Sequence, residues 1–172
     1  MPREENRMKT AVVFYSMSGN VRYVADKIAG KTDADLIVLE PEKAYPEEGF
    51  RKFFWGGKSA VMGEKPRLKA YDFTASAYDL IVLGTPVWAG TYNPCLRSFI
   101  YDSREQLKGK TFAAFCCHSG GGGEKTLRKL REALGIERWK AELSLVDPKD
   151  RPDEEKEAQI EEFCAKIQEE HQ

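Results

Sequence analysis

The sequence has few of the residues that bind metals, and it lacks a long apolar segment. Only two of its 172 residues are histidines, so a site built from several histidines is not expected. Its four cysteines show no paired zinc-ligand spacing, and without a targeting signal they favour a reducing cytoplasm. No apolar run approaches the roughly 20 residues that span a bilayer, and the polar start, MPREENRMK, lacks the apolar core of a signal peptide. We therefore expect a cytoplasmic protein without membrane contact.

An excess of charge of either sign is also missing. The chain has 27 Lys and Arg against 28 Asp and Glu, and a formal net charge of −1, which argues against a dedicated nucleic-acid-binding protein. Its length of 172 residues suits one domain with a sizeable core, and no internal repeat or low-complexity linker divides it. We predict a single domain over residues 1–172, with residues 1–8 as a flexible lead-in.

Strand and helix patterns alternate five times along the chain. Short apolar runs predict strands at residues 11–15, 35–40, 78–84, 111–117 and 139–146. Apolar stripes of helical period, or a cap followed by proline, predict helices at residues 21–29, 94–103, 124–134 and 153–170. Residues 41–79 are the least regular part, with a short helix expected near residues 50–62 and a surface excursion after it. This alternation predicts an α/β fold, a doubly wound parallel sheet with helices on both faces.

Three loops rich in small residues follow the first, third and fourth predicted strands. Their sequences are SMSGN, TPVWAGTYNP and HSGGGG. Because ligands of such sheets bind outside the carboxyl ends of the strands, we expect the loops to converge. The first loop enters a helix N-terminus, whose N–H groups and dipole suit a phosphate, although an ordinary capped turn is the alternative. Trp88 in the second loop can supply an aromatic wall or, alternatively, half-buried packing.

The phosphate-binding motifs of several other α/β proteins are absent. No lysine follows the glycine within residues 16–21, which argues against a nucleoside-triphosphate hydrolase. The G-x-G-x-x-G spacing of dinucleotide-binding proteins is missing as well. Ser16 and Thr85-Pro86 stand where a phosphoacceptor of the receiver type needs acidic residues. The remaining candidate is a ligand with one phosphate and a flat aromatic part.

These motifs resemble those of the flavodoxin family, which binds flavin mononucleotide (FMN). The family's phosphate loop, Thr/Ser-x-Thr/Ser-Gly-x-Thr, matches residues 16–20 but departs at Val21, a missing hydroxyl that would weaken binding by about 1–2 kcal/mol. The stretch YDLIVLGTPVWAG resembles the loop that lines the flavin ring, and FCCHSGGGGEKT resembles the loop at the ring's pyrimidine end. The resemblance covers residues 9–167 and implies a flavodoxin-like three-layer sandwich with strand order 2-1-3-4-5. The cofactor-binding residues that it implies are Ser16, Met17, Ser18, Gly19, Asn20, Val21, Thr85, Pro86, Val87, Trp88, Ala89, Gly90, Cys117, His118, Ser119, Gly120, Gly121 and Gly122.

The resemblance implies two alternative functions that use bound FMN. An electron carrier would shuttle between redox partner proteins, with Ala89 or Gly90 presenting a backbone carbonyl to N5 of the reduced flavin. A reductase would take hydride from NAD(P)H and pass it to a quinone or another small acceptor. The near-zero net charge, the basic residues after HSGGGG and the absence of an aromatic residue in that loop lean away from the standard carrier, although Tyr92 or Trp55 can cover the flavin instead.

A third hypothesis is a flavin-free interaction domain with the same fold. His118 is expected to hydrogen-bond or protonate the flavin or, alternatively, to cap the fourth strand. The adjacent Cys116 and Cys117 are expected to be buried thiols that act as small hydrophobic groups. No catalytic constellation of nucleophile and base, or of paired carboxylates, is predicted.

Overall fold

The protein is built on a five-stranded parallel sheet. The computed structural model describes residues 8–45 and 63–170. The strand order is β2-β1-β3-β4-β5, and every neighbouring pair is parallel. This order confirms the topology that the resemblance implied. The strands are β1 (Thr10–Phe14), β2 (Asp35–Val38), β3 (Leu80–Pro86), β4 (Thr111–His118) and β5 (Glu142–Val146).

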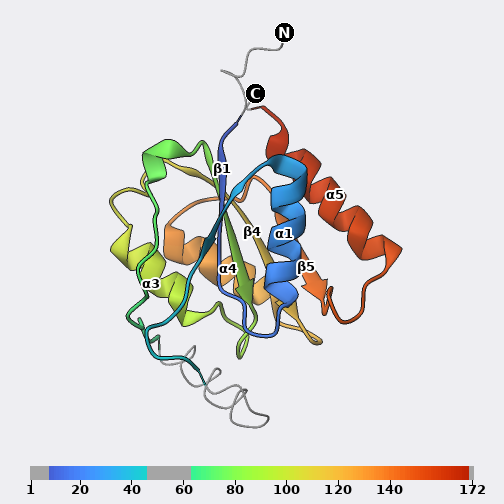
Figure 1. Ribbon diagram of the computed structural model, residues 1–172, viewed down its shortest axis with the longest axis horizontal. Coiled ribbons are helices and arrows are strands. Elements are labelled where there is room, and N and C mark those ends of the chain that lie inside the picture. The colour runs from blue at the N-terminus through green and yellow to red at the C-terminus, as the bar shows by residue number, and fades with distance from the viewer. Residues whose placement is uncertain (1–7, 46–62, 171–172) are drawn as a thin grey trace.

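Helices cover both faces of this sheet. Figure 1 shows α1 and α5 together on one face and α3 and α4 on the other. Local signals fix where they begin: the Asn93 side chain accepts a hydrogen bond from the Cys95 amide at 2.7 Å, as the sequence predicts, and Asp153 caps α5 in the same way. Within the described residues, no helix is long and apolar enough to cross a membrane. The helices are α1 (Asn20–Thr32), α3 (Pro94–Asp102), α4 (Gly123–Leu134) and α5 (Glu154–Gln168).

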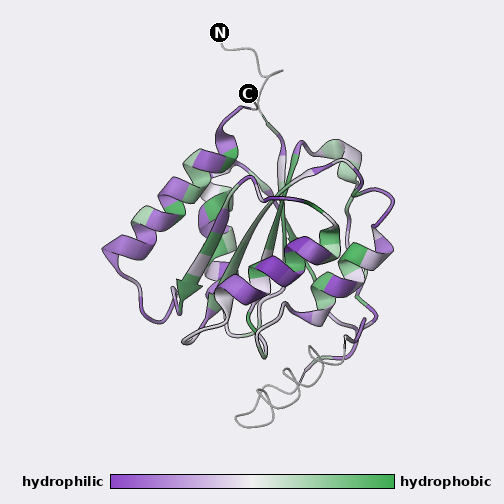
Figure 2. Ribbon diagram, turned by 180° about the vertical axis from the view of Figure 1, so that it is seen from behind, coloured by the Kyte–Doolittle hydropathy of each residue, from purple (hydrophilic) through white to green (hydrophobic). Residues whose placement is uncertain are grey.

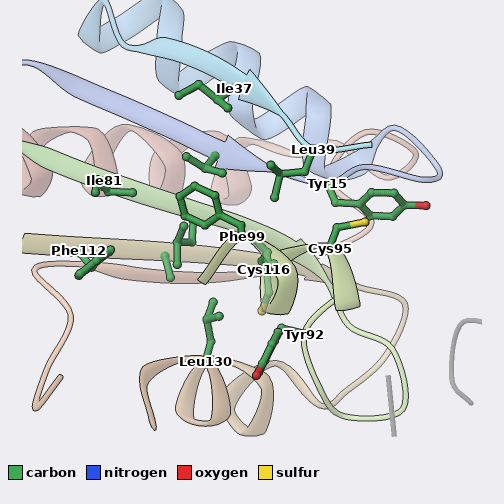
Figure 3. Close-up of a cluster of buried hydrophobic side chains, with 14 of the residues drawn as sticks. Tyr15, Ile37, Leu39, Ile81, Tyr92, Cys95, Phe99, Phe112, Cys116 and Leu130 are labelled. Carbon is green, nitrogen blue, oxygen red and sulfur yellow. The ribbon is translucent and has the colours of Figure 1, made fainter. Parts of the chain in front are cut away.

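Two hydrophobic cores lie on opposite faces of the sheet because successive strand residues point to opposite sides. Ile81 of β3 belongs to the core under α3 and α4, whereas its neighbour Leu80 belongs to the core under α1 and α5. Figure 3 shows the first core, in which Phe99 and Leu130 from the helices lie over the strands. Figure 2 shows hydrophobic residues on the strands and hydrophilic ones along the outer faces of the helices. The inward stripe predicted for α5 is buried: Ile160, Phe163, Cys164 and Ile167.

The element boundaries differ from the sequence prediction by a few residues. Strand β3 begins at Leu80 and continues to Pro86, because its last two residues pair with Cys116 and Cys117. Strand β5 begins at Glu142, although the carbonyl of Ala141 already accepts from β4. The helix expected near residues 50–62 lies outside the described residues. The excursion that follows contains a short 3₁₀ helix, η2 (Ala75–Ala77).

The two ends of the described chain meet at the amino edge of the sheet. The Lys140 ammonium lies 3.8 Å from the Met8 sulfur and donates to the carbonyl of Glu169. Figure 1 shows both ends at the top, with the strands running away from them toward the lower edge. The opposite, carboxyl edge is therefore formed by the loops that follow the strands.

Candidate functional site

A pocket of about 450 Å³ lies at the carboxyl edge of the sheet, within the size range of small-molecule sites. The loops after β1, β3 and β4 meet there, as the sequence analysis expects. A wider hollow of about 910 Å³ lies at the amino edge, but none of the three loops reaches it. The residues that line the pocket are Met17, Ser18, Asn20, Val21, Pro86, Val87, Trp88, Ala89, Cys117, His118, Ser119, Asp147, Asp150 and Arg151.

Seven residues of the predicted site do not line this pocket. Some lie directly behind it: Thr85 is fully buried, and its hydroxyl accepts from the Asn93 amide at 2.9 Å and donates to the Pro86 carbonyl at 2.7 Å. The side chain of Thr85 therefore holds the second loop in shape. The seven are Ser16, Gly19, Thr85, Gly90, Gly120, Gly121 and Gly122.

The first loop turns sharply into α1 through Gly19, whose φ of +93° is favourable only for glycine. The first N–H groups of any helix have no intrahelical acceptor, and Gly19 at the N-cap position has no side chain that could accept from them. Of these, the Arg22 amide donates to the Ser16 hydroxyl at 3.1 Å. The loop thus combines a helix N-terminus with the hydroxyls of Ser16 and Ser18. The alternative interpretation of this loop, an ordinary capped turn, applies to Ser16, whose hydroxyl caps the helix. It does not apply to Asn20, because the side chain of Asn20 forms its hydrogen bonds elsewhere.

Val21 is buried in the core below α1 and only 2% exposed. Its position in the apolar stripe of α1 explains why this residue is a valine: the side chain packs with Val24 and Ala25 while its edge lines the pocket. Because residue 21 is a valine, the site has no hydroxyl at this position.

The second loop contains a tight turn at its tip. Trp88 and Thr91 exchange two backbone hydrogen bonds, of 2.9 and 3.1 Å. Both central residues have positive φ, +52° at Ala89 and +73° at Gly90, which is the signature of a type I′ turn. An alanine in this conformation is strained by about 1–2 kcal/mol. The turn therefore holds an exposed, strained peptide at the rim of the pocket.

Trp88 belongs to an aromatic cluster as well as to the pocket. Its ring lies edge-on to Tyr15, with centroids 5.7 Å apart, and to Tyr45 at 5.0 Å. The two tyrosines also meet edge-on at 6.0 Å. Edge-to-face contacts of this kind hold aromatic rings in fixed orientations. Trp88 is thus half-buried packing and pocket wall at once, which reconciles the two alternatives for it. Tyr45 was not predicted, because it lies in the irregular segment after β2.

His118, the last residue of β4, spans two elements. Its Nδ1 accepts from the Gly121 amide at 2.8 Å, so Nε2 carries the proton and donates to the Ser144 hydroxyl at 3.1 Å. Both ring nitrogens are therefore used to hold the third loop against β5. This arrangement fits the capping alternative, while one edge of the ring lines the pocket.

The third loop approaches the second through Gly122. A Cβ atom there would lie 3.0 Å from Val87 Cγ1 and 3.4 Å from the α-carbon of Gly90, and its φ is +87°. Only glycine allows this close approach of the two loops. Near the end of β4, burial raises the pKa of the Cys116 thiol to about 11 and also raises that of Cys117. Both thiols stay protonated and serve as small apolar groups, as predicted for buried cysteines.

A fourth loop, residues 147–153 after β5, completes the pocket and was missed by the sequence analysis. Asp147 donates its amide to the His118 carbonyl at 3.0 Å, and Lys149 donates its amide to Asn20 Oδ1 at 2.9 Å. The loop reaches the first loop because α5 returns beside α1, where Lys27 pairs with Glu157 at 2.8 Å. The available signal was the charged run DPKDR directly after a strand, since every parallel strand ends at the same edge.

Known structures share this architecture at low sequence identity. A flavoprotein from Lactobacillus acidophilus in complex with FMN aligns with a TM-score of 0.70 and 18% identity, covering 91% of this chain and 98% of the other. Two-electron reduced Megasphaera elsdenii flavodoxin aligns with a TM-score of 0.56 and 17% identity, covering 91% and 96%. Oxidised flavodoxin 1 from Bacillus cereus aligns with a TM-score of 0.51 and 20% identity, covering 92% of this chain and 96% of the other. No curated protein matches the sequence.

The sequence itself also carries the family pattern. The flavodoxin family model matches residues 9–158, which include all five strands and the four loops of the pocket. This match and the strand order agree with the resemblance in the loop motifs. The chain belongs to the flavodoxin family.

Proposed function

We propose that this protein binds FMN at the carboxyl edge of its sheet and transfers electrons through it. The observation that carries the proposal is the convergence of a hydroxyl-bearing helix N-terminus, an oriented tryptophan and a close glycine contact around one pocket. The first suits a phosphate and the second a flat ring, while Gly122, which does not itself line the pocket, lets the third loop pack closely against the second. The residues present therefore fit FMN.

Each loop has a separate role in this proposal. The hydroxyls of Ser16 and Ser18 and the N-terminus of α1 would hold the phosphate. Residues 86–90, with Trp88, would line the isoalloxazine ring, and residues 118–121 would adjoin its pyrimidine end. When bound, the flavin supplies the redox chemistry. The protein orients it, excludes water from one side and tunes its electronics through hydrogen bonds.

The turn at Ala89 and Gly90 favours the electron carrier as the first candidate. Its peptide is exposed at the pocket rim, and glycine at the second central position accepts either sign of φ. A backbone carbonyl here can therefore be turned toward the flavin, where it would accept a hydrogen bond from the N–H group that the ring carries once an electron and a proton have been added. This makes single-electron steps with redox partner proteins the proposed activity.

A specific observation also favours the second candidate, an NAD(P)H-dependent reductase. The Lys125 side chain passes close to Gly90, within 3.4 Å of where a Cβ would stand, and Arg128 lies one turn further along α4. In the described part of the chain, neither side chain forms an ion pair, and α4 does not show the pairing of Glu124 with Arg128 that its spacing allows. The Lys125 cation beside the ring loop, with Arg128 one turn along the same helix, suits the phosphates of a pyridine nucleotide.

Titration of the flavin-free protein with FMN, followed by quenching of flavin fluorescence, tests the binding step. We expect Ser18→Asp to weaken FMN binding at least about tenfold, because it places a carboxylate beside the phosphate. Ser119→Asp is the matched control: it adds the same charge at the ring end, and we expect a clearly smaller loss. Equal losses would refute the proposed orientation. A wild-type protein that binds no FMN would support the interaction-domain hypothesis instead.

Anaerobic reduction separates the two redox candidates. Light-driven reduction that proceeds through a stable one-electron stage supports the carrier. Rapid bleaching of the flavin by NADPH or NADH alone would contradict a pure carrier and support the reductase.

A further inference from the structure

Lys149 lies across the first loop of the site. If Gly19 carried a Cβ atom, that atom would lie 2.8 Å from Lys149 Nζ and 3.3 and 3.5 Å from Cδ and Cε. The methylene stem and the ammonium group therefore occupy the space that a side chain at position 19 would take. The backbone of Lys149 is fixed too, because its amide donates to Asn20 Oδ1 at 2.9 Å. Main chain and side chain of Lys149 thus both contact the start of α1.

The Lys149 side chain is exposed, and no carboxylate of the described residues pairs with its ammonium. Across residues 8–45 and 63–170, Lys149 forms no ion pair, and the first turn of α1 has no acidic residue. Two carboxylates of the fourth loop also line the pocket: Asp147 pairs with Arg151 at 3.9 Å, and Asp150 forms no ion pair within the described residues. The Arg22 guanidinium is engaged elsewhere, with Asp26 at 3.2 Å. Lys149 is the ammonium that lies on the loop.

We propose that Lys149 binds the terminal phosphate of the flavin and makes the site selective for FMN over riboflavin. This inference rests on the proposed function. A helix N-terminus and two hydroxyls stabilise a phosphate through dipoles, whereas an ammonium adds a full charge and a charge-assisted hydrogen bond. Lys149 thereby compensates for the hydroxyl that Val21 does not provide. Because Lys149 supplies this contact from the fourth loop, the first loop would need one polar side chain fewer to bind the phosphate.

Paired titrations with FMN and riboflavin test this role. Lys149→Met keeps most of the apolar stem and the backbone contact to Asn20 but removes the charge. We expect its Kd for FMN to rise about five- to tenfold and its Kd for riboflavin to change less than about twofold, since one charge-assisted bond is lost. Lys149→Arg should retain most of the FMN affinity. Lys129→Met on α4 removes the same charge away from the loop and should leave both constants unchanged.

Salt provides a second readout that a merely structural role would not affect. Added sodium chloride should weaken FMN binding by the wild-type protein more than by Lys149→Met, because the lost interaction is one between charges. Unchanged FMN affinity in Lys149→Met would overturn the inference while the proposed function stands. Equal losses for FMN and riboflavin would overturn it in favour of a purely structural loop contact. A wild-type protein that binds neither flavin would refute the proposed function itself.

Discussion

Replacing Gly84 with alanine should destabilise the protein although it adds a single methyl group. Gly84 lies in β3 and pairs in register with Phe115 of β4. An added Cβ atom would lie 2.4 Å from Phe115 Cζ and 2.8 Å from Cε1, far inside van der Waals contact. The ring has little room to retreat, because it is fully buried and packs edge-on to Phe163 of α5 with centroids 6.5 Å apart. The phenyl ring of Phe115 therefore occupies the space that a side chain at position 84 would need.

The expected size of the effect follows from this overlap. Overpacking of a close-packed core costs about 1–3 kcal/mol, and alanine recovers up to about 1 kcal/mol by restricting the unfolded chain. The net loss of about 1–2 kcal/mol corresponds to a melting temperature lower by roughly 2–8 °C for a chain of this length. Urea unfolding of the flavin-free protein, followed by circular dichroism, measures the free energy of unfolding directly.

Gly30 provides the matched control. It is an exposed residue of α1 with helical backbone, and no atom outside the helix backbone lies within 4 Å of where its Cβ would stand. The same change, Gly30→Ala, should therefore stabilise the protein by about 0.5–1 kcal/mol. Phe115→Leu should reduce the cost of Gly84→Ala, because it removes the ring atoms that overlap. Stability of Gly84→Ala equal to wild type, or the same cost in both backgrounds, would refute this reasoning.

Three further predictions concern backbone strain, pH and thiols. Ala89→Gly should raise the free energy of unfolding by about 0.5–1 kcal/mol, because glycine relieves the positive φ of the turn. Glu157→Gln should lower the melting temperature by about 1–4 °C at pH 7. Lys27 and the Tyr23 hydroxyl lower the pKa of Glu157, so this stabilisation is present above the unfolded pKa and disappears as the pH falls through the folded one. The four cysteines should react slowly with a thiol reagent at pH 8 and fully after unfolding, because burial raises the pKa of Cys95, for example, to about 12.

Each of these predictions has an outcome that contradicts it. A destabilised Ala89→Gly variant would show that the turn is not strained. For the ion pair, Glu162→Gln on the same helix is the control, since its partner Lys166 lies at 3.2 Å but both side chains are more than half exposed. A difference between Glu157→Gln and wild type that persists at pH 3 would contradict the electrostatic explanation. Fast labelling of any thiol in the folded protein would contradict its burial.

The sheet and most of its helices could be predicted because burial leaves a local record in the sequence. The run from Ala11 to Tyr15 is apolar throughout, as a strand covered on both faces requires, and the stripe of α5 is apolar only on its inner side. Caps such as Asn93 act within two residues and are visible for the same reason. Three of the loops stood out through their small residues, and the topology alone then brought them to one edge.

The rest depends on contacts between residues far apart in the sequence. The fourth loop joins the pocket because α5 lies beside α1, an arrangement in which Lys27 meets a partner 130 residues away. Tyr45 reaches Trp88 from a segment without regular structure. Neither contact leaves a periodic pattern or a motif. The residues behind the pocket, such as Thr85, were placed in the site by resemblance, but only the structure shows that this hydroxyl bonds to the backbone of its own loop.

The meeting of both ends of the described chain at Lys140 has a consequence for attaching this protein to an electrode. A linker attached at Met8 or Glu169 would hold the molecule by the amino edge of the sheet and leave the pocket facing the solution. The eight residues of β4, at about 3.3 Å each, put roughly 25 Å between that edge and the pocket. For the proposed flavin in this pocket, electrons would not tunnel efficiently over this distance. Molecules tethered at the amino edge would keep the pocket open to the solution, while direct current between electrode and flavin would require the opposite orientation.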